Sequence, residues 1–130
     1  MLERGQQDSV RLLTRLSEVQ SAEIQTTIVT YEEQMRGWLA FAAQSNSLQK
    51  TVIAYERLQT HIAVFRNVPL LPFDAIAADI YAELRKSRIR IGVMDLRIAS
   101  IALAYDATVI SRNLRDFSLV PGLRVEDWAQ

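Results

Sequence analysis

The chain has 130 residues, of which 49% are hydrophobic and 23% are charged, and its 15 basic residues balance its 15 acidic ones. The length suits a single domain over residues 1–130, and the composition excludes both a disordered chain and a surface that is basic throughout. The chain has no Cys and a single His, His61, so its own residues exclude disulfides, thiol catalysis and zinc sites. No apolar run approaches the roughly 18 residues of a membrane span.

A helix and a strand are predicted at the start of the chain. Apolar residues recur every three positions between Asp8, a plausible N-cap, and Gln20, which indicates a first helix. The β-branched run EIQTTIVT, residues 23–30, is typical of a strand that ends at Thr30. We therefore expect a strand directly before the helical pattern that begins at Tyr31.

A helical hairpin is predicted next. From Tyr31 the apolar period is helical, and the polar residues 45–47 interrupt it before it resumes. The resumed helix carries apolar residues at spacings of three and four, which predicts a seam of core side chains: Val52, Tyr55, Leu58, Ile62 and Phe65. We expect His61 at the edge of this seam, where a single histidine makes a weak catalytic candidate.

Strands and helices alternate in the second half of the chain. The sequence predicts a brief strand in VPLLPF and then a helix that runs from its cap Asp74 to about Lys86. A largely buried helix opens near Asp95, and it is followed by a strand in ATVI and a last short strand in LRVEDW. This alternation favours an α/β fold with a parallel sheet between layers of helices. Right-handed crossovers then place the ends of TTIVT and ATVI on one rim of the sheet.

Three carboxylates fall at this rim. Glu33 follows TTIVT, Asp95 opens the buried helix, and Asp116 follows ATVI. Converging carboxylates are the ligands that Mg²⁺ and Mn²⁺ prefer, so the three acids together indicate a metal site. Each acid also has a structural alternative, since Glu33 and Thr30 have the spacing of a capping box. Asp95 could be a helix N-cap, and Asp116 could neutralise a neighbouring arginine in a solvated turn.

The segment from residue 85 to residue 115 is locally basic. It contains only two acids, Asp95 and Asp106, against seven basic residues: Arg85, Lys86, Arg88, Arg90, Arg97, Arg112 and Arg115. Arginine pairs bidentately with phosphate, so this excess indicates a polyanionic substrate brought to the metal site. The alternative is a solvated basic face that serves solubility.

Four motifs, in this order along the chain, resemble those of the PIN-domain ribonucleases, specifically the VapC-type toxins: TTIVTYEEQMRG, LPFDAIAADIYAELR, MDLRIASIALAYDATVISRNLRDF and VPGLRVEDW. The resemblance runs from about Leu2 to Trp128. Its most specific parts are the helix start DLRIA and the segment SRNLRDF after a strand. It implies an α/β/α sandwich around a parallel sheet, and a metal-dependent endoribonuclease that hydrolyses RNA, commonly tRNA, with Mg²⁺ or Mn²⁺.

The resemblance also implies roles for individual residues. The acidic pocket that holds the metal and carries catalysis would consist of Glu33, Asp95 and Asp116. Polar positions of the pocket would be Thr30, Ser111 and Asn113. The RNA backbone would be steadied by arginines, for which we take Arg90, Arg97, Arg112 and Arg115.

The resemblance further implies protein partners. Members of the family commonly dimerise and are held inactive by a small VapB-type antitoxin, so we expect a homodimer and an antitoxin partner. The sequence shows no charged segment followed by an apolar one at its start, as a secretion signal would have. We therefore expect a cytoplasmic protein without a membrane contact.

One strand of the family pattern is absent from this sequence. In the family, a central first strand ends in an acid within a D-T-[ND]-like motif before the first helix, whereas this chain begins with MLERGQQDSV. Asp8 has no strand before it and is no substitute. The loss would expose the edges of the strands that normally flank the first one. Either the true start lies upstream of Met1, or the chain is a shortened relative.

Two functions remain open from the sequence. The first is a metal-dependent endoribonuclease, and the second is a non-catalytic PIN-like module that binds an antitoxin or its own twin. A D-T-[ND]-like strand encoded in frame upstream of Met1 would favour the enzyme. A stop codon there would favour the module.

Overall fold

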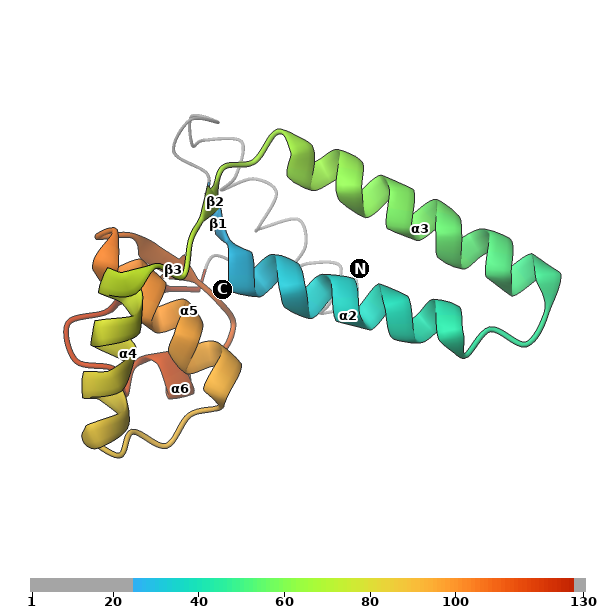
Figure 1. The fold of residues 1–130 in the computed structure, drawn as a ribbon. Helices are drawn as coiled ribbons and strands as arrows, with labels where there is room; N and C mark the ends of the chain where they lie inside the picture. Colours follow the sequence, from blue (N-terminus) through green and yellow to red (C-terminus); the bar gives the residue numbers. More distant parts are fainter. Residues whose placement is uncertain (1–24, 128–130) are drawn as a thin grey trace, which may run out of the picture. The chain divides into compact units, whose positions relative to one another are not determined.

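The computed structural model describes residues 25–127 (Figure 1). The helix predicted between Asp8 and Gln20 lies outside these residues. The chain divides into two compact units, which we call the hairpin unit, residues 25–72, and the α/β unit, whose described part is residues 73–127. A single PIN-like domain over residues 1–130 stays a prediction.

The hairpin unit begins with β1 (Thr26–Thr27), which is shorter than the sequence predicted. The helix α2 (Ile28–Ala43) starts directly after it, so the prediction that the strand continues to Thr30 is wrong. Thr27 has an extended backbone, and its side chain accepts a hydrogen bond from the Thr30 backbone N at 2.9 Å. Because Thr27 is the N-cap, the β-branched residues that follow it form the first turn of the helix.

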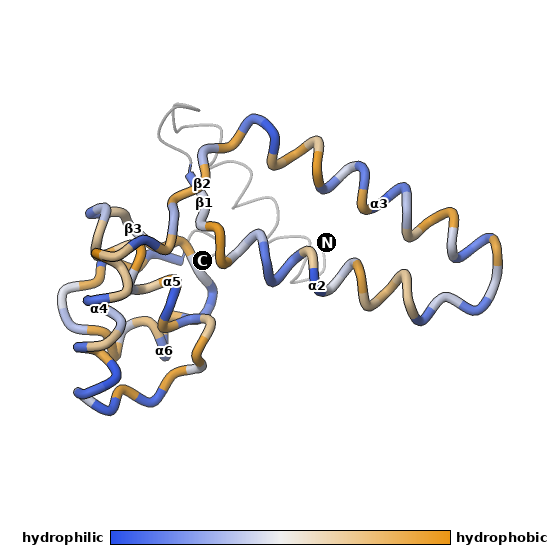
Figure 2. Tube along the Cα trace, viewed as in Figure 1, coloured by the Kyte–Doolittle hydropathy of each residue, from blue (hydrophilic) through white to orange (hydrophobic). Residues whose placement is uncertain are grey.

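The predicted hairpin is confirmed. The second helix, α3 (Leu48–Arg66), begins after Ser47, whose side chain accepts a hydrogen bond from the Lys50 backbone N at 3.2 Å. Apolar and polar residues alternate along both helices (Figure 2). A short strand, β2 (Leu70–Leu71), follows as predicted and pairs in parallel with β1.

The predicted seam of α3 is only partly correct. Val52, Tyr55 and Ile62 are 56%, 61% and 45% exposed, so they do not form the core of the hairpin. The buried residues are Ala54, Leu58 and His61, so Leu58 of the predicted seam is confirmed, but the buried face is rotated from that seam. The apolar residues of α3 cover more than one face, so the period alone did not identify the buried one.

His61 is buried rather than at the edge of the seam, with 7% of its surface exposed. Its ring stacks on Tyr31 of α2, with ring centres 5.5 Å apart, and lies 4.6 Å from the ring of Phe65. Among the described residues, its Nε2 atom has no hydrogen-bond partner. The histidine therefore acts as a member of an aromatic core.

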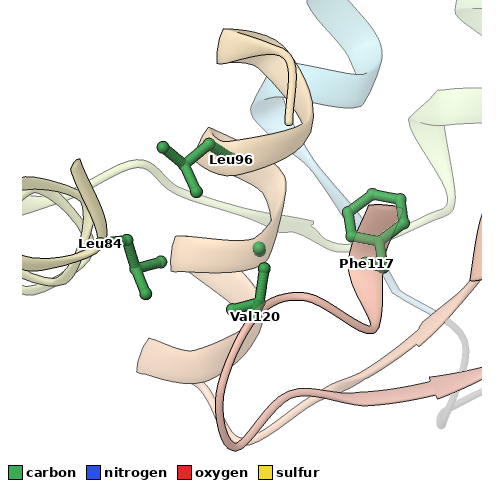
Figure 3. Close-up of a cluster of buried hydrophobic side chains, with 5 residues drawn as sticks. Leu84, Leu96, Phe117 and Val120 are labelled. Carbon is green, nitrogen blue, oxygen red and sulfur yellow. The ribbon is translucent and has the colours of Figure 1, made fainter. Parts of the chain in front are cut away.

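The α/β unit is built on two packed helices. Asp74 caps α4 (Ala75–Lys86), as predicted, by accepting a hydrogen bond from the Ala77 backbone N at 3.0 Å. The helix α5 (Val93–Ala104) is largely buried and begins after Gly92. The core cluster of the unit consists of Leu84, Leu96, Ala99, Phe117 and Val120 (Figure 3).

The strands of the α/β unit pair in parallel, as predicted. β3 (Thr108–Ile110) and β4 (Arg124–Glu126) are in register from Thr108 opposite Arg124 to Ile110 opposite Glu126. The strands in residues 25–127 form two two-stranded sheets, β1 with β2 and β3 with β4, and not one continuous sheet. Within the same residues, no helix combines the length and hydropathy needed to cross a bilayer.

Candidate acidic site

Asp95 and Asp116 lie close enough in the α/β unit for the charge of Asp116 to act on Asp95, and Asn113 influences both acids. Asp95 lies in the first turn of α5, and Asp116 lies in α6 (Leu114–Phe117), the short helix after β3. The Nδ2 atom of Asn113 donates a hydrogen bond to the Oδ2 atom of Asp116 at 3.1 Å. The same amide is near enough to Asp95 to favour its ionised form. Both carboxylates are half-buried.

The pKa of Asp95 reflects this arrangement. Burial raises the pKa of Asp95 above its ordinary value of 3.8, and the charge of Asp116 raises it further. The hydrogen-bonding influence of Asn113 acts in the opposite direction and lowers it. Two acids that repel each other in a partly desolvated place favour a proton or a cation between them.

The turn after β3 is held by Ser111. The Oγ atom of Ser111 accepts a hydrogen bond from the backbone N of Asn113 at 2.9 Å, which fixes the start of α6. Phe117 at the other end of α6 is buried in the core of the unit and anchors the same turn. The polar positions Ser111 and Asn113, predicted to lie beside the acids, therefore orient the turn that carries Asp116.

The structural alternatives for two of the acids are wrong. The N-cap of α5 is Gly92, so Asp95 is not a cap but lies inside the first turn, where the helix dipole favours a negative charge. The N-cap of α2 is Thr27, so Thr30 and Glu33 do not form a capping box. The hydroxyl groups of Thr30 and Thr27 lie 2.9 Å apart instead.

Glu33 belongs to the hairpin unit, where it lies exposed in α2. Its convergence with Asp95 and Asp116 stays a prediction. Within residues 25–127, no group of three His, Asp or Glu side chains is arranged to hold a metal ion. The pair of Asp95 and Asp116 is therefore the part of the predicted acidic pocket that the α/β unit forms by itself.

The predicted RNA-binding arginines lie in the α/β unit. Arg90 and Arg115 are exposed and form no ion pair within the described chain, and Arg112 is exposed as well. Arg97 is half-buried, with its Nη1 atom 3.5 Å from the sulfur of Met94. Asp116 accepts a hydrogen bond from Asn113, and among the described residues Arg115 forms no ion pair with it, whereas the alternative that Asp116 neutralises Arg112 stays open.

Sequence reasoning missed the helix α6. Asn113 occupies its N-cap position, and Leu114 and Phe117 lie three residues apart, which is the spacing of one helical face. These signals were present in the sequence, but a helix of one turn offers too few residues for a periodic pattern. The consequence is that Asp116 is held by helical backbone and not by an open loop.

Comparison with known proteins gives relatives of one kind, although no family model matches the chain. Ribonuclease VapC of Rickettsia bellii is 43% identical over 60 residues, which cover 43% of this chain and 45% of that protein. Ribonuclease VapC2 of Rickettsia felis is 33% identical over 78 residues, covering 56% and 58%. The tRNA(fMet)-specific endonuclease VapC of Salmonella typhimurium is 38% identical over 66 residues, covering 48% and 50%. The chain spans about half the length of the curated relatives it matches.

Solved structures share the fold. VapBC-1 from nontypeable Haemophilus influenzae has a TM-score of 0.72 at 22% identity, covering 92% of this chain and 86% of that one. FitAcB from Neisseria gonorrhoeae has a TM-score of 0.70 at 25% identity, covering 91% and 84%. VapBC2 from Rickettsia felis, bound to a DNA fragment from its promoter, has a TM-score of 0.63 at 27% identity, covering 81% and 74%. The chain is therefore similar in sequence to VapC ribonucleases over about half of their length, and it shares the α/β fold of these solved structures.

Proposed function

We propose that the chain is a metal-dependent endoribonuclease of the VapC type, which hydrolyses phosphodiester bonds of RNA. The observation that carries this proposal is the cluster of Asp95, Asn113 and Asp116, in which Asn113 donates a hydrogen bond to Asp116 and the charge of Asp116 acts on Asp95. Its sequence relatives include ribonucleases VapC and a tRNA(fMet)-specific endonuclease, which makes tRNA the first substrate to test.

The donor set fits a hard divalent cation. Carboxylate oxygens are preferred ligands of Mg²⁺ and Mn²⁺, and a cation would offset both the burial and the repulsion from Asp116 that raise the pKa of Asp95. Asp95 and Asp116 would hold the ion, with Glu33 as the third acidic ligand and Thr30 beside it. A bound ion would polarise the scissile phosphate and lower the pKa of an attacking water.

The side chains around the acids have supporting roles in this proposal. Ser111 and Asn113 keep Asp116 in place, so that the carboxylate enters the site already oriented. Arg90, Arg112 and Arg115 are exposed cations of the same unit and would contact the RNA backbone, together with Arg97.

The partners follow from the solved relatives. VapBC-5 from Mycobacterium tuberculosis, a solved structure that is 25% identical with a TM-score of 0.55, is described as a member of the VapBC family of toxin-antitoxin systems. We infer that this chain binds a VapB-type antitoxin, forms a homodimer and acts in the cytoplasm.

The experiment is cleavage of a tRNA pool and of a single-stranded RNA in the presence of Mg²⁺ or Mn²⁺. Asp95→Asn should abolish metal-dependent cleavage, because the variant keeps the shape of the side chain but loses its charge. The matched control is Asp79→Asn, which removes an exposed acid from α4 of the same unit and should cleave at the wild-type rate. Equal cleavage by both variants would remove Asp95 from the reaction. A wild-type chain that binds the antitoxin but never cleaves RNA would be a binding module.

A further inference from the structure

Two arginines from different helices meet over one tyrosine ring in the α/β unit. The guanidinium carbon of Arg85, on α4, lies 5.8 Å from the ring centre of Tyr81, and that of Arg97, on α5, lies 6.0 Å from it. The Nη1 atom of Arg85 also donates a hydrogen bond to the Tyr81 hydroxyl at 3.0 Å. The ring itself packs edge-on against Phe73, with ring centres 5.9 Å apart. The ring of Tyr81 therefore packs against Phe73, and two cations lie within about 6 Å of its centre.

These two cations are not neutralised by the described part of the chain. Neither Arg85 nor Arg97 forms an ion pair there, whereas the neighbouring acid Glu83 is bound to Lys86 at 3.3 Å. A guanidinium has five N–H donors. Arg85 directs one toward Tyr81, and Arg97 directs one toward the sulfur of Met94. Most of the donors of this pair remain available to an anion.

Arg97 of this pair lies near Asp95 of the candidate acidic site along α5, but the two residues lie on different sides of that helix. Arg97 comes two residues after Asp95 in α5, which corresponds to about 3 Å along the axis and about 200° around it. A ligand that contacts both places therefore has to wrap around the start of α5, which a flexible single strand with a phosphate at each nucleotide can do.

We propose that Tyr81, Arg85 and Arg97 form a phosphate clamp for single-stranded RNA, a binding site that extends the proposed ribonuclease function on which it rests. Arg85 and Arg97 contact the phosphates. Tyr81 is a positioning residue, because its ring and hydroxyl hold the two flexible side chains before RNA binds and so reduce the entropy lost on binding.

The first test measures binding without cleavage, by fluorescence anisotropy of a labelled single-stranded RNA in EDTA at several salt concentrations. The double variant Arg85→Gln with Arg97→Gln should bind more weakly by roughly tenfold for each arginine. The slope of log affinity against log salt should fall by about 1.4, since each phosphate contact on a single strand contributes about 0.7.

The matched control is the double variant Lys86→Gln with Arg88→Gln. It removes the same number of charges from exposed positions next to the clamp, but the cations that lie over Tyr81 are Arg85 and Arg97 and remain in place. It should keep most of the affinity and of the salt slope. Equal losses in the two double variants would overturn the clamp and leave only a diffuse basic surface.

Tyr81 is tested by two substitutions. Tyr81→Phe keeps the ring under both cations and loses only the hydroxyl bond to Arg85, so it should weaken RNA binding less than Tyr81→Leu does. A reduced salt slope in Tyr81→Leu, at a melting temperature near that of the wild type, supports positioning of the arginines. An unchanged slope in Tyr81→Leu would overturn that role.

The outcome of this test is separable from that of the proposed function. A wild-type chain that binds RNA through the clamp, yet never cleaves it with Mn²⁺, would refute the ribonuclease and leave the clamp standing. A wild-type chain that does not bind RNA in EDTA would overturn the clamp. Tighter binding of a polyglutamate peptide than of RNA, lost in the same double variant, would also overturn it by assigning the arginines to an acidic protein partner.

Discussion

The side-chain amide of Asn113 donates to the carboxylate of Asp116 at 3.1 Å, and this contact sets the position of the second acid of the candidate site. The amide also favours the ionised form of Asp95, while burial and the charge of Asp116 disfavour it. The three side chains therefore form one electrostatic unit, in which a change at one position alters the others.

The raised pKa of Asp95 makes the stability of the chain depend on pH. A carboxyl group whose pKa is raised on folding stabilises the fold while it is protonated, and this contribution is lost as the pH rises through its folded pKa. Asp95→Asn should therefore raise the melting temperature at pH 7, and the gain should disappear below pH 3.8, the ordinary value of the group.

Thermal unfolding between pH 3 and pH 7 measures this difference. Asp79→Asn, at an exposed position of α4, serves as the control and should show no comparable gain. A lower melting temperature of Asp95→Asn at pH 7 would mean that the carboxylate stabilises the fold through a contact stronger than its repulsion from Asp116.

Asp74 should show the opposite pH dependence. The hydroxyl of Tyr105 donates to Asp74, and this bond, followed by that from the Ala77 backbone N, lowers the pKa of Asp74 below 3.8. A lowered pKa gives stability that is present above the ordinary value and is lost as the pH falls through the folded value. Asp74→Ala should therefore lower the melting temperature most at pH 7 and least in acid. A constant loss at every pH would assign the effect to the shape of the cap alone.

Glu33→Gln should weaken Mn²⁺ binding. Because Thr27 and not Thr30 caps α2, Glu33 has no capping role that its substitution would disturb. Titration calorimetry with Mn²⁺ measures the affinity, and Glu32→Gln is the control, since Glu32 is already paired with Arg36 on the same helix. The same Mn²⁺ affinity in Glu33→Gln and wild type would remove Glu33 from the metal site.

His61→Phe should stabilise the hairpin unit. The Nε2 atom of His61 is buried without a partner among the described residues, and such a group costs about 1 kcal/mol or more. Phenylalanine keeps the aromatic contacts with Tyr31 and Phe65 and removes the polar atom. His61→Ala instead creates a cavity and should cost about 2 kcal/mol or more. Urea unfolding compares the two, and a loss in both would mean that Nε2 has a partner in solution.

The sequence by itself determined the elements that depend on local signals. The polar interruption before α3, the cap Asp74 of α4, and the short apolar runs of β2, β3 and β4 were all readable, because each signal lies within a few residues of the element that it defines. Asp95 and Asp116 could also be identified from the sequence as candidate site residues, because Asp95 opens a predicted helix and Asp116 follows a predicted strand.

Only the tertiary structure decided which residues meet. The β-branched run after Thr27 became helix because its cap outweighed its strand propensity, and the buried face of α3 was chosen by the packing partner that α2 presents. Neither the contact between Asn113 and Asp116 nor the meeting of Arg85 and Arg97 over Tyr81 follows from periodicity. Such contacts depend on rotamers and on the packing of separate helices, and a one-dimensional pattern carries no information about either.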